Sequence, residues 1–269
     1  MIYRKLLTGI EKYGSEKNDI CRQFIGIDIC NISESVIIAP WWEPKVFDPF
    51  WTDIKYMCES EFASIKVWSM IVNSKAVTYI RTGIGAPVLT DVVLALGITN
   101  CHKLLFVGSV GSLDEKIGIG DIVIPEYSIS GDGVSRYLKG NRLKENDVFG
   151  EKIFSDKVLF TELCRITERV ATNNGTKYHI GSAFSIDTIF SQFAYIDEIL
   201  EMGCNVIEME TAAAFRAAEI AGISMAAIFS VSDNTITKKS LLSGRTQEEM
   251  DYRRKVRKGI IPKIISEII

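Results

Sequence analysis

Three acidic side chains of this chain stand directly after apolar stretches. Glu208 and Glu210, separated by Met209, follow a short apolar run, and Asp233 follows the apolar run 223–231. Because strand ends of an α/β sheet meet at one edge, these segments are expected to face one crevice. A carboxylate accepts hydrogen bonds from vicinal sugar hydroxyls, and an aspartyl group can protonate a departing base. The pattern predicts a site for a polyhydroxylated, nitrogen-bearing small molecule, although each acid alone is equally typical of a helix start or a turn.

Two glycine-rich turns are expected to supply other walls of this site. Gly-Ser-Val-Gly at 108–111 follows the apolar strand 103–107, and the hydroxyl of Ser109 with nearby amides can hold an anion. Gly-Ile-Gly at 83–85 precedes a predicted helix, but Val88 stands where a dinucleotide fingerprint needs its third glycine. Taken singly, each turn also fits an ordinary strand-to-turn junction.

The elements that must position these residues alternate between strand-like and helix-like apolar patterns, which favours a mixed or parallel sheet flanked by helices. Strands are expected at 35–40, 65–72, 76–81, 103–107, 121–125, 178–184, 206–207 and 223–231. Helices are expected at 87–96, 154–171, 194–201, 209–221 and from about 247, the last ending or kinking before Pro262. Residues 131–149 read as a long surface loop. One domain is expected over 1–269, with 1–33 as an N-terminal extension that holds a short helix.

Composition restricts the function classes. A chain of 269 residues with 47% hydrophobic content can bury a sizeable core. The net charge of -3 argues against a nucleic-acid binder. No apolar run is long enough to span a bilayer, and no signal-peptide pattern is visible. The six cysteines lack metal or disulfide spacing and only two histidines exist, so no metal site is expected and a cytoplasmic location fits reduced thiols.

Several short motifs, taken in order, resemble the nucleoside phosphorylase family, which includes the uridine phosphorylases and the methylthioadenosine/adenosylhomocysteine nucleosidases. The resemblance covers about 34 to 268, and its motifs lie at 83–87, 108–111, 120–123, 184–187, 208–210 and 232–234. It implies a three-layer α/β/α fold around a mixed sheet that partly closes into a barrel. It also implies a homo-oligomer, as a dimer, trimer or hexamer, that acts on a small-molecule nucleoside.

The resemblance further implies roles on the sugar side. The implied ribose-binding residues are Glu208, Met209 and Glu210, with Met209 packed beneath the sugar. Asp233 would support protonation of purine N7, and Arg245 would orient it. The implied reaction cleaves the N-glycosidic bond through a transition state resembling an oxocarbenium ion, in which charge on the ribose must be stabilised.

Base and phosphate contacts are implied as well. Phe184 would stack on the base beside Ser232, while Gly108 and Ser109 would hold phosphate. The segment 185–193 contains no Gln/Arg pair of the kind that reads uracil, which favours a purine. No cofactor is expected, only inorganic phosphate as the co-substrate that yields a free base and ribose 1-phosphate.

The phosphate side departs from the family pattern. The Gly-Asp-Pro-x-Arg loop of phosphorolytic members is replaced at 40–45 by Pro-Trp-Trp-Glu-Pro-Lys, and the arginine before the Gly-Ser loop is replaced by Phe106. A phosphate dianion needs cationic partners, and phenylalanine offers none. Lys45 and Arg81 are the expected substitutes, unless a neighbouring subunit donates a cation.

Two other functions therefore stay open beside phosphorolysis. Glu43 or another acid would activate water in a phosphate-independent nucleosidase, and a non-catalytic nucleoside binder would keep the sugar contacts alone. Trp41 and Trp42 are hypothesised to line the pocket or a subunit interface, against ordinary packing. The basic run 253–258 is expected to be a solvated helix face.

Overall fold

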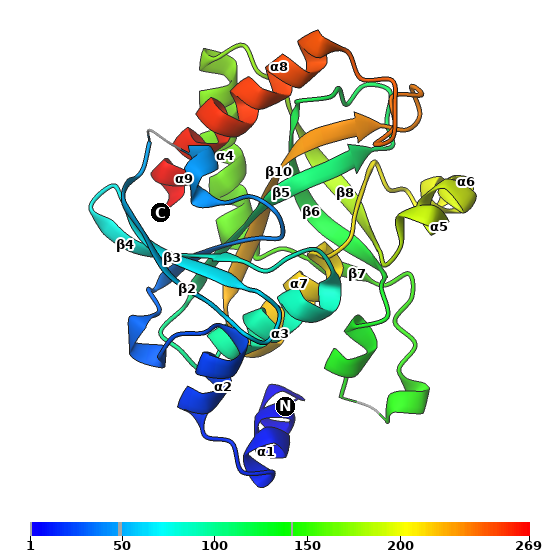
Figure 1. Cartoon of the computed structure of the whole chain (residues 1–269). Coiled ribbons are helices and arrows are strands. Elements are labelled where there is room, and N and C mark those ends of the chain that lie inside the picture. Colours follow the sequence, from blue (N-terminus) through cyan, green and yellow to red (C-terminus); the bar gives the residue numbers. More distant parts are fainter. Residues whose placement is uncertain (1, 48–49, 141) are drawn as a thin grey trace.

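A mixed sheet that partly closes on itself organises the chain (Figure 1). The structure is a computed structural model that describes residues 2–47, 50–140 and 142–269. Its strands are β1 (Ser35–Ala39), β2 (Thr52–Glu59), β3 (Lys66–Val72), β4 (Lys75–Arg81), β5 (Lys103–Ser112), β6 (Ile122–Gly131), β7 (Lys152–Phe154), β8 (Tyr178–Ile186), β9 (Val206–Glu208) and β10 (Ser224–Asn234). They follow the order β10-β6-β8-β9-β5-β1-β4-β3-β2, with β7 paired to β6. Because β10 also pairs with β5, the strands β10, β6, β8, β9 and β5 form a closed ring.

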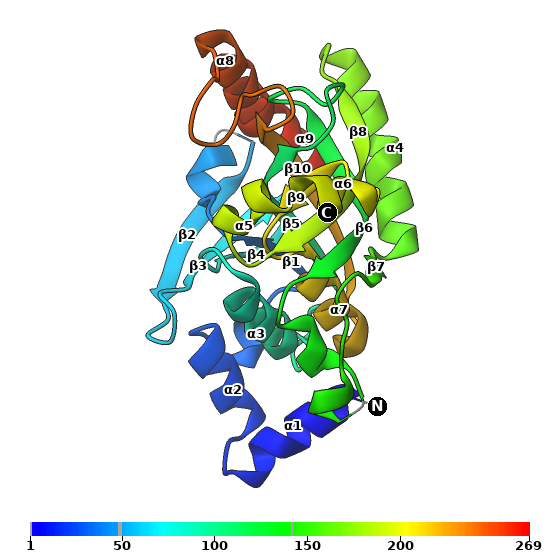
Figure 2. The ribbon, with the colours of Figure 1, turned by 90° about the vertical axis from the view of Figure 1, so that its right-hand side faces the viewer.

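Helices cover both faces of this sheet (Figures 1 and 2). They are α1 (Ile2–Lys12), α2 (Lys17–Phe24), α3 (Ala86–Leu96), α4 (Lys157–Asn173), α5 (Ile189–Ala194), α6 (Ile196–Glu201), α7 (Thr211–Ala221), α8 (Gln247–Lys255) and α9 (Ile261–Ile268). Side chains of α2, α3 and α7 fill one core, and those of α4 and α9 fill the other. Strand β1 shows why two cores form, because side chains alternate between the faces of a strand: Val36 and Ile38 enter the first core and Ile37 enters the second. The predicted three-layer α/β/α fold with a partly barrel-like mixed sheet is confirmed.

The N-terminal segment contains two helices where one short helix was expected. Gly14, at φ 96°, ends the first helical segment in a conformation that few other residues adopt. The hydroxyl of Tyr3 donates a hydrogen bond to the Leu94 carbonyl of α3 at 2.7 Å. Ile20 and Ile25 are buried in the core beneath α3. These contacts bind α1 and α2 to the body of the chain.

The strands of the ring are longer than predicted. β5 continues to Ser112, so Gly108 and Gly111 lie within a strand and not in a loop that follows it, as the sequence had suggested. Pairing explains this extension, since β5 is paired with β10 along its length and with β9 at its end. β2 was not predicted at all, because it is an edge strand whose residues are mostly exposed.

Several helix boundaries also differ from expectation. The helix expected at 154–171 begins after Asp156, whose carboxylate accepts the Leu159 N–H at 2.8 Å and caps α4, while β7 occupies the preceding residues. The helix expected at 194–201 is two short helices, α5 and α6. As predicted, the last helix is interrupted before Pro262, because α8 ends at Lys255 and a π-helical turn, Val256–Ile260, leads into α9.

Candidate active site

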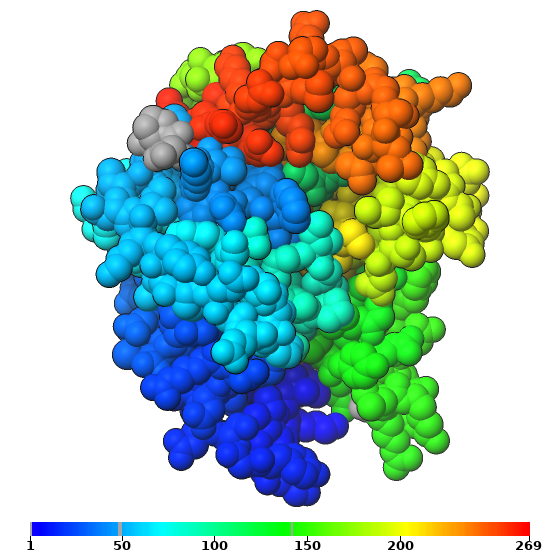
Figure 3. All heavy atoms as spheres, in the orientation of Figure 1, coloured from blue at the N-terminus to red at the C-terminus, as the bar shows by residue number. Residues whose placement is uncertain are grey.

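A cavity of about 320 Å³ lies where β5, β9 and β10 reach the same edge of the sheet. Figure 3 shows the hollow that opens between the loop at 40–45 (the 40s loop, blue), α5 (yellow) and the segment before α8 (orange). Its lining residues are Pro40, Trp41, Trp42, Ile84, Gly108, Ser109, Ile189, Glu208, Met209, Glu210, Ser232, Leu241, Arg245 and Arg253. The implied ribose, phosphate-loop and Ser-Asp-Asn segments of the sequence thus contribute to one cavity.

Glu208 is fixed at the start of α7. Its Oε2 atom accepts the backbone N–H groups of Glu210 at 2.6 Å and of Thr211 at 2.7 Å. Its Oε1 atom accepts a hydrogen bond from the hydroxyl of Ser185. Burial raises the pKa of this carboxyl, and the hydrogen bond from Ser185 opposes the shift. Because these bonds occupy Glu208 within the protein, its main effect is to position the neighbouring Glu210.

Glu210 joins the acidic segment to the Gly-Ile-Gly turn. Its Oε1 atom accepts the N–H of Gly85 at 2.7 Å, and Gly85 has φ 121°, where a side chain would be strained. The side chain of Glu210 is 5% exposed. Burial, followed by the charge of Glu208, raises the pKa of Glu210 to about 8. The turn and the acid thus reach the same cavity, as the sequence had indicated.

Asp233 follows Ser232 on β10 but does not itself line the cavity. The Ser232 hydroxyl is 2.5 Å from the Asp233 Oδ1 atom, to which it donates. Burial raises the pKa of Asp233, against the hydrogen bond from Ser232 and the charge of Arg245. On the paired strand, Gly111 leaves room for this carboxyl, because a Cβ there would stand 3.2 Å from Asp233 Oδ2.

Arg245 holds the backbone around the aspartyl group. Its Nη1 atom donates to the Ser232 carbonyl at 3.4 Å and its Nη2 atom to the Leu241 carbonyl at 3.0 Å. Arg245 therefore acts on Asp233 through its positive charge and through the shape of the chain around it. Ser232 and Arg245 line the cavity together with the acidic pair, whereas Asp233 does not line it and is linked to it through the Ser232 hydroxyl.

Phe184 is not brought to this cavity. It lies in a neighbouring cavity of about 340 Å³, with its ring 6.2 Å from that of Phe149 at an angle of 71°. Strand alternation explains the difference, because Ser185 points toward Glu208 and its neighbour Phe184 must face the other way. The apolar side chains that do face the cavity include Ile189 of α5 and Leu241.

A cation reaches Ser109 from α8. The Nη2 atom of Arg253 donates to Ser109 Oγ at 2.9 Å, and Arg253 lines the cavity. Burial, followed by the charges of Arg257 and Arg245, lowers the pKa of Arg253 to about 10. The expectation of a fully solvated helix face at 253–258 is wrong for Arg253. The signal available in the sequence was spacing, because Arg253 and Arg257 are four residues apart and share a helix face.

Lys45 and Arg81, the cations expected from sequence, lie outside the cavity. Arg81 Nη1 donates to Glu43 Oε1 at 2.8 Å, and Lys66 Nζ lies 3.7 Å from the same oxygen. Glu43 and Lys45 line a separate recess beside Trp68. The ion pair therefore occupies both Arg81 and Glu43, the acid that was considered for water activation.

The two tryptophans of the 40s loop behave differently. Both line the cavity, so the pocket-lining part of their hypothesis is confirmed. Trp42 is 3% exposed and its carbonyl accepts a hydrogen bond from the Tyr79 hydroxyl at 2.8 Å. Trp41, in contrast, is 68% exposed at the cavity rim. Trp42 thus holds the loop in place, whereas Trp41 presents an exposed apolar surface at the cavity rim.

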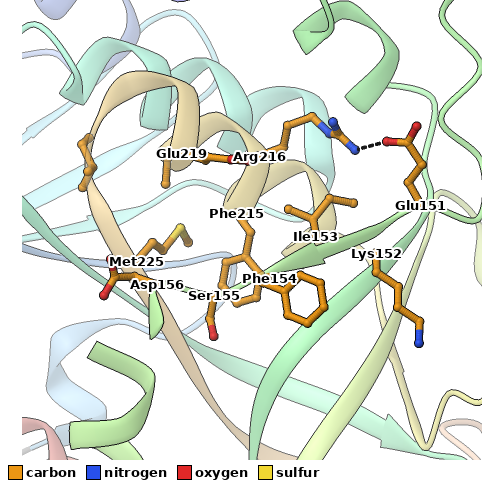
Figure 4. A pocket seen from close by; sticks show the side chains of 12 residues that line it. Glu151, Lys152, Ile153, Phe154, Ser155, Asp156, Phe215, Arg216, Glu219 and Met225 are labelled. Carbon is orange, nitrogen blue, oxygen red and sulfur yellow. Dashed lines mark hydrogen bonds and ion pairs between the residues drawn. The ribbon is translucent and has the colours of Figure 1, made fainter. Parts of the chain in front are cut away.

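A further cavity, of about 350 Å³, lies between β7 and α7 (Figure 4). Arg216 donates to Glu151 across its edge at 2.8 Å, and Phe154 and Phe215 contribute apolar surface. None of the site residues expected from sequence line it. Among the described residues, no cluster of three metal-ligating side chains is found, and no helix there has the length and apolar character needed to cross a membrane.

Comparison with known proteins agrees with this geometry. Residues 51–265 match the family model described as the phosphorylase superfamily. The chain belongs to this superfamily. A DeoD-type purine nucleoside phosphorylase of Bacillus velezensis is 24% identical over 181 residues, which cover 67% of this chain and 73% of the relative. The DeoD-type enzyme of Buchnera aphidicola subsp. Baizongia pistaciae is 30% identical over 143 residues, covering 53% and 56%.

Solved structures of the superfamily share the fold. Uridine phosphorylase from Vibrio fischeri ES114 matches with a TM-score of 0.72 and 19% identity, covering 96% of this chain and 97% of that one. Purine nucleoside phosphorylase from Toxoplasma gondii, in complex with immucillin-H, matches with a TM-score of 0.70 and 18% identity, covering 90% and 93%. At these identities the likeness establishes the fold and leaves the choice of base open.

Proposed function

We propose that this member of the phosphorylase superfamily cleaves purine nucleosides with inorganic phosphate and releases the base and ribose 1-phosphate. The observation that carries the proposal is the shared cavity, in which Glu210 faces the same space as Ser109 with its partner Arg253. A sugar-binding acid and an anion-binding cation are the two groups that phosphorolysis requires at the anomeric carbon. The purine-specific names of the sequence relatives support the same reading.

The sugar would lie against the start of α7. Glu210 offers a carboxyl group to the ribose hydroxyls, and Met209 beside it lines the cavity as an apolar surface. Glu208 holds this corner through the N–H of Glu210, so it acts by positioning. Hydrogen bonds to the hydroxyls strengthen as positive charge develops on the ribose, which lowers the barrier.

The base would leave toward Asp233. Because burial raises the pKa of Asp233, its carboxyl holds a proton more readily than an exposed aspartate does and can share it with purine N7 as the C1′–N9 bond breaks. The Ser232 hydroxyl orients one oxygen of Asp233, and Arg245 holds the surrounding backbone. Ile189 and Leu241 offer apolar contact to the flat ring. The preference for a purine rests on this aspartyl group.

Phosphate would bind at Gly108 and Ser109 with Arg253. A guanidinium group pairs with phosphate oxygens in a bidentate manner, and the Ser109 hydroxyl adds a further hydrogen bond. One phosphate oxygen then forms the bond to C1′ while the C1′–N9 bond electrons move to the base, which takes the proton. Arg253 thus assumes the role that the sequence assigned to Lys45 and Arg81.

Two alternatives remain as outcomes of the test. A nucleosidase would use water as the nucleophile, but the ion pair with Arg81 and a place outside the cavity count against Glu43 as its base. A nucleoside-binding protein would bind without cleavage. The experiment measures base release from inosine, adenosine and uridine, with and without phosphate. Release that requires phosphate supports the proposal, and equal release without phosphate rejects it in favour of hydrolysis.

We further propose that the chain assembles as a homo-oligomer in the cytoplasm. Trp41 and Ile84 are 68% and 58% exposed at the cavity rim, which a second copy would cover. All six cysteines are free, as a reducing compartment requires. Light scattering on the purified chain measures the oligomeric state, and a monomer at micromolar concentration would contradict the assembly.

A further inference from the structure

A second recess adjoins the candidate active site, on the side of α8. It has a volume of about 170 Å³ and is lined by four arginines, Arg245, Arg253, Arg254 and Arg257, with Ile119, Ser232 and Met250. Ser232, Arg245 and Arg253 also line the cavity of the candidate active site, so the two spaces are neighbours. We call this recess the arginine pocket. Its lining includes no Asp or Glu side chain.

The positive charge of the arginine pocket is only partly balanced. Arg254 pairs with Asp251 at 2.6 Å on the exposed face of α8. Arg257 lies over the ring of Trp42, with its guanidinium carbon 5.7 Å from the ring centroid. The Nε atoms of Arg253 and Arg257 are buried without a hydrogen-bond partner among the described residues. Such buried donors are unusual in folded proteins, and a bound ligand or ion is one way to complete their pairing.

Mutual repulsion adds to this imbalance. Burial, and then the positive charge of Arg254, lowers the pKa of Arg257, while the charge of Arg257 contributes to the lowered pKa of Arg253. Asp233 is the acid whose charge acts in the opposite direction on Arg253. Gathering guanidinium groups in this way is unfavourable for folding unless an anion offsets it.

The backbone holds these arginines in place. Arg253 is in the last turn of α8, and Arg257 is in the π-helical turn that follows, so both face the same side. The Tyr252 hydroxyl donates to Asp121 at 3.3 Å and thereby fixes α8 against the start of β6. Gly120 allows this close packing, since a Cβ there would stand 2.9 Å from the Arg253 nitrogen. The cluster therefore sits on a rigid element, as a binding site requires.

We propose that the arginine pocket binds a second phosphoryl group, beside the inorganic phosphate that the proposed function places at Ser109. Guanidinium groups match phosphate oxygens in geometry and charge, and four of them exceed what one orthophosphate at Ser109 needs. Because the shared wall includes Arg253, next to the proposed phosphate position, the group is either an ester on the nucleoside itself, as in a nucleoside monophosphate, or a second free phosphate.

The test separates these two sources. Calorimetry measures the stoichiometry of inorganic phosphate binding and the affinities for inosine and inosine monophosphate, and base release from both is followed with phosphate present. The variants are Arg257→Gln, Arg254→Gln and, as the matched control, Lys255→Gln, an exposed cation of the same helix outside both spaces. Circular dichroism checks folding, and Arg254→Gln, with a side chain 57% exposed, serves if Arg257→Gln does not fold.

If the group is an ester on the nucleoside, the wild type should bind inosine monophosphate at least about tenfold more tightly than inosine. Arg257→Gln should bind the two with similar affinity, whereas Lys255→Gln should keep the wild-type preference. A free group predicts two phosphates bound per chain in the wild type and one in Arg257→Gln. A single phosphate per chain together with equal affinities, or identical behaviour of Arg257→Gln and Lys255→Gln, overturns the proposal. Binding that follows these patterns without any base release would reject the proposed function and leave the arginine pocket standing.

Discussion

The two sides of the cavity are built in different ways. The acidic side comes from consecutive residues, Glu208 to Glu210, whose carboxylates are at most 7% exposed and accept backbone N–H groups. The basic side comes from α8, and Arg253 meets Ser109 across a sequence separation of 144 residues. The first depends on the closed ring of strands, whereas the second depends on how one C-terminal helix packs against it.

This difference shows which part of the site can change its residues most readily. Glu208 and Glu210 are held by a strand end and by the first turn of α7, so their positions depend on the sheet itself. A cation, in contrast, can arrive from any element that reaches Ser109. Phe106, where the family pattern has an arginine, is 1% exposed and packs edge-on against Phe229 at 5.0 Å, so it serves the core. Arg253 instead brings a positive charge to Ser109 from α8.

Asp233→Asn provides the largest expected effect. The amide cannot deliver a proton to the base, so kcat for inosine should fall by about 10²–10⁴-fold, with a much smaller change in KM. Steady-state base release measures both constants. Asp197→Asn, an exposed substitution on α6, is the matched control and should behave as the wild type. Nearly unchanged turnover in Asp233→Asn would remove the aspartyl group from the mechanism.

Arg253→Gln tests the basic side. Loss of a charged hydrogen-bond donor should raise KM for phosphate by about 10- to 100-fold and leave nucleoside binding comparatively unaffected. Initial rates at varied phosphate and saturating inosine give the value, with Lys255→Gln as control. An equal rise in the KM values of both substrates would mean that Arg253 supports the whole cavity and does not select phosphate.

Glu210→Gln tests the acidic side through stability. Because the pKa of Glu210 is raised to about 8 in the folded chain, the folded state keeps a proton that the unfolded state releases above its ordinary pKa near 4.5. Its contribution to the free energy of unfolding should therefore decline as pH rises from about 5 to 8, by up to about 1.4 kcal/mol per pH unit.

Urea denaturation at pH 5, 6.5 and 8 measures this decline. The stability of Glu210→Gln relative to the wild type should increase with pH, because glutamine carries no charge to bury. Glu219→Gln, an exposed change on the same helix, is the control and should show no such trend. A difference between Glu210→Gln and the wild type that is constant with pH would show that Glu210 is already ionised in the folded chain.

The different origins of the acidic and basic sides explain which contacts of the site could be predicted from the sequence. The sequence predicted that the acidic pair would meet the Gly-Ile-Gly turn, because Glu208, Glu210 and Gly85 each lie beside a strand-like apolar run. Such strand ends gather at one edge of the sheet. Arg253 was missed because nothing local to α8 indicates that Ser109 is its partner. Phe184 was placed wrongly because its face depends on the register of β8 relative to β9, where Phe184 pairs with Ile207.

Strand lengths were underestimated for a related reason. Polar and glycine residues such as 108–112 read as a loop when only local propensity is considered, yet they continue β5 because β10 and β9 offer hydrogen-bond partners on both sides. Edge strand β2 escaped notice because its mostly exposed residues carry little periodic signal. Three-dimensional pairing, which no short window contains, decides these cases.

Lys45→Gln gives the smallest expected effect and the sharpest check on the basic side. Lys45 lines the recess beside Trp68 and not the cavity of the candidate active site, so its removal should change KM for phosphate by less than about twofold, within the range of ordinary surface substitutions. The measurement uses the same phosphate titration as for Arg253→Gln. A large rise in KM would mean that Lys45 reaches phosphate in an assembled oligomer, for example across a subunit contact near Trp41. The basic side would then be shared between copies, and Arg253 would be one of two cations at Ser109.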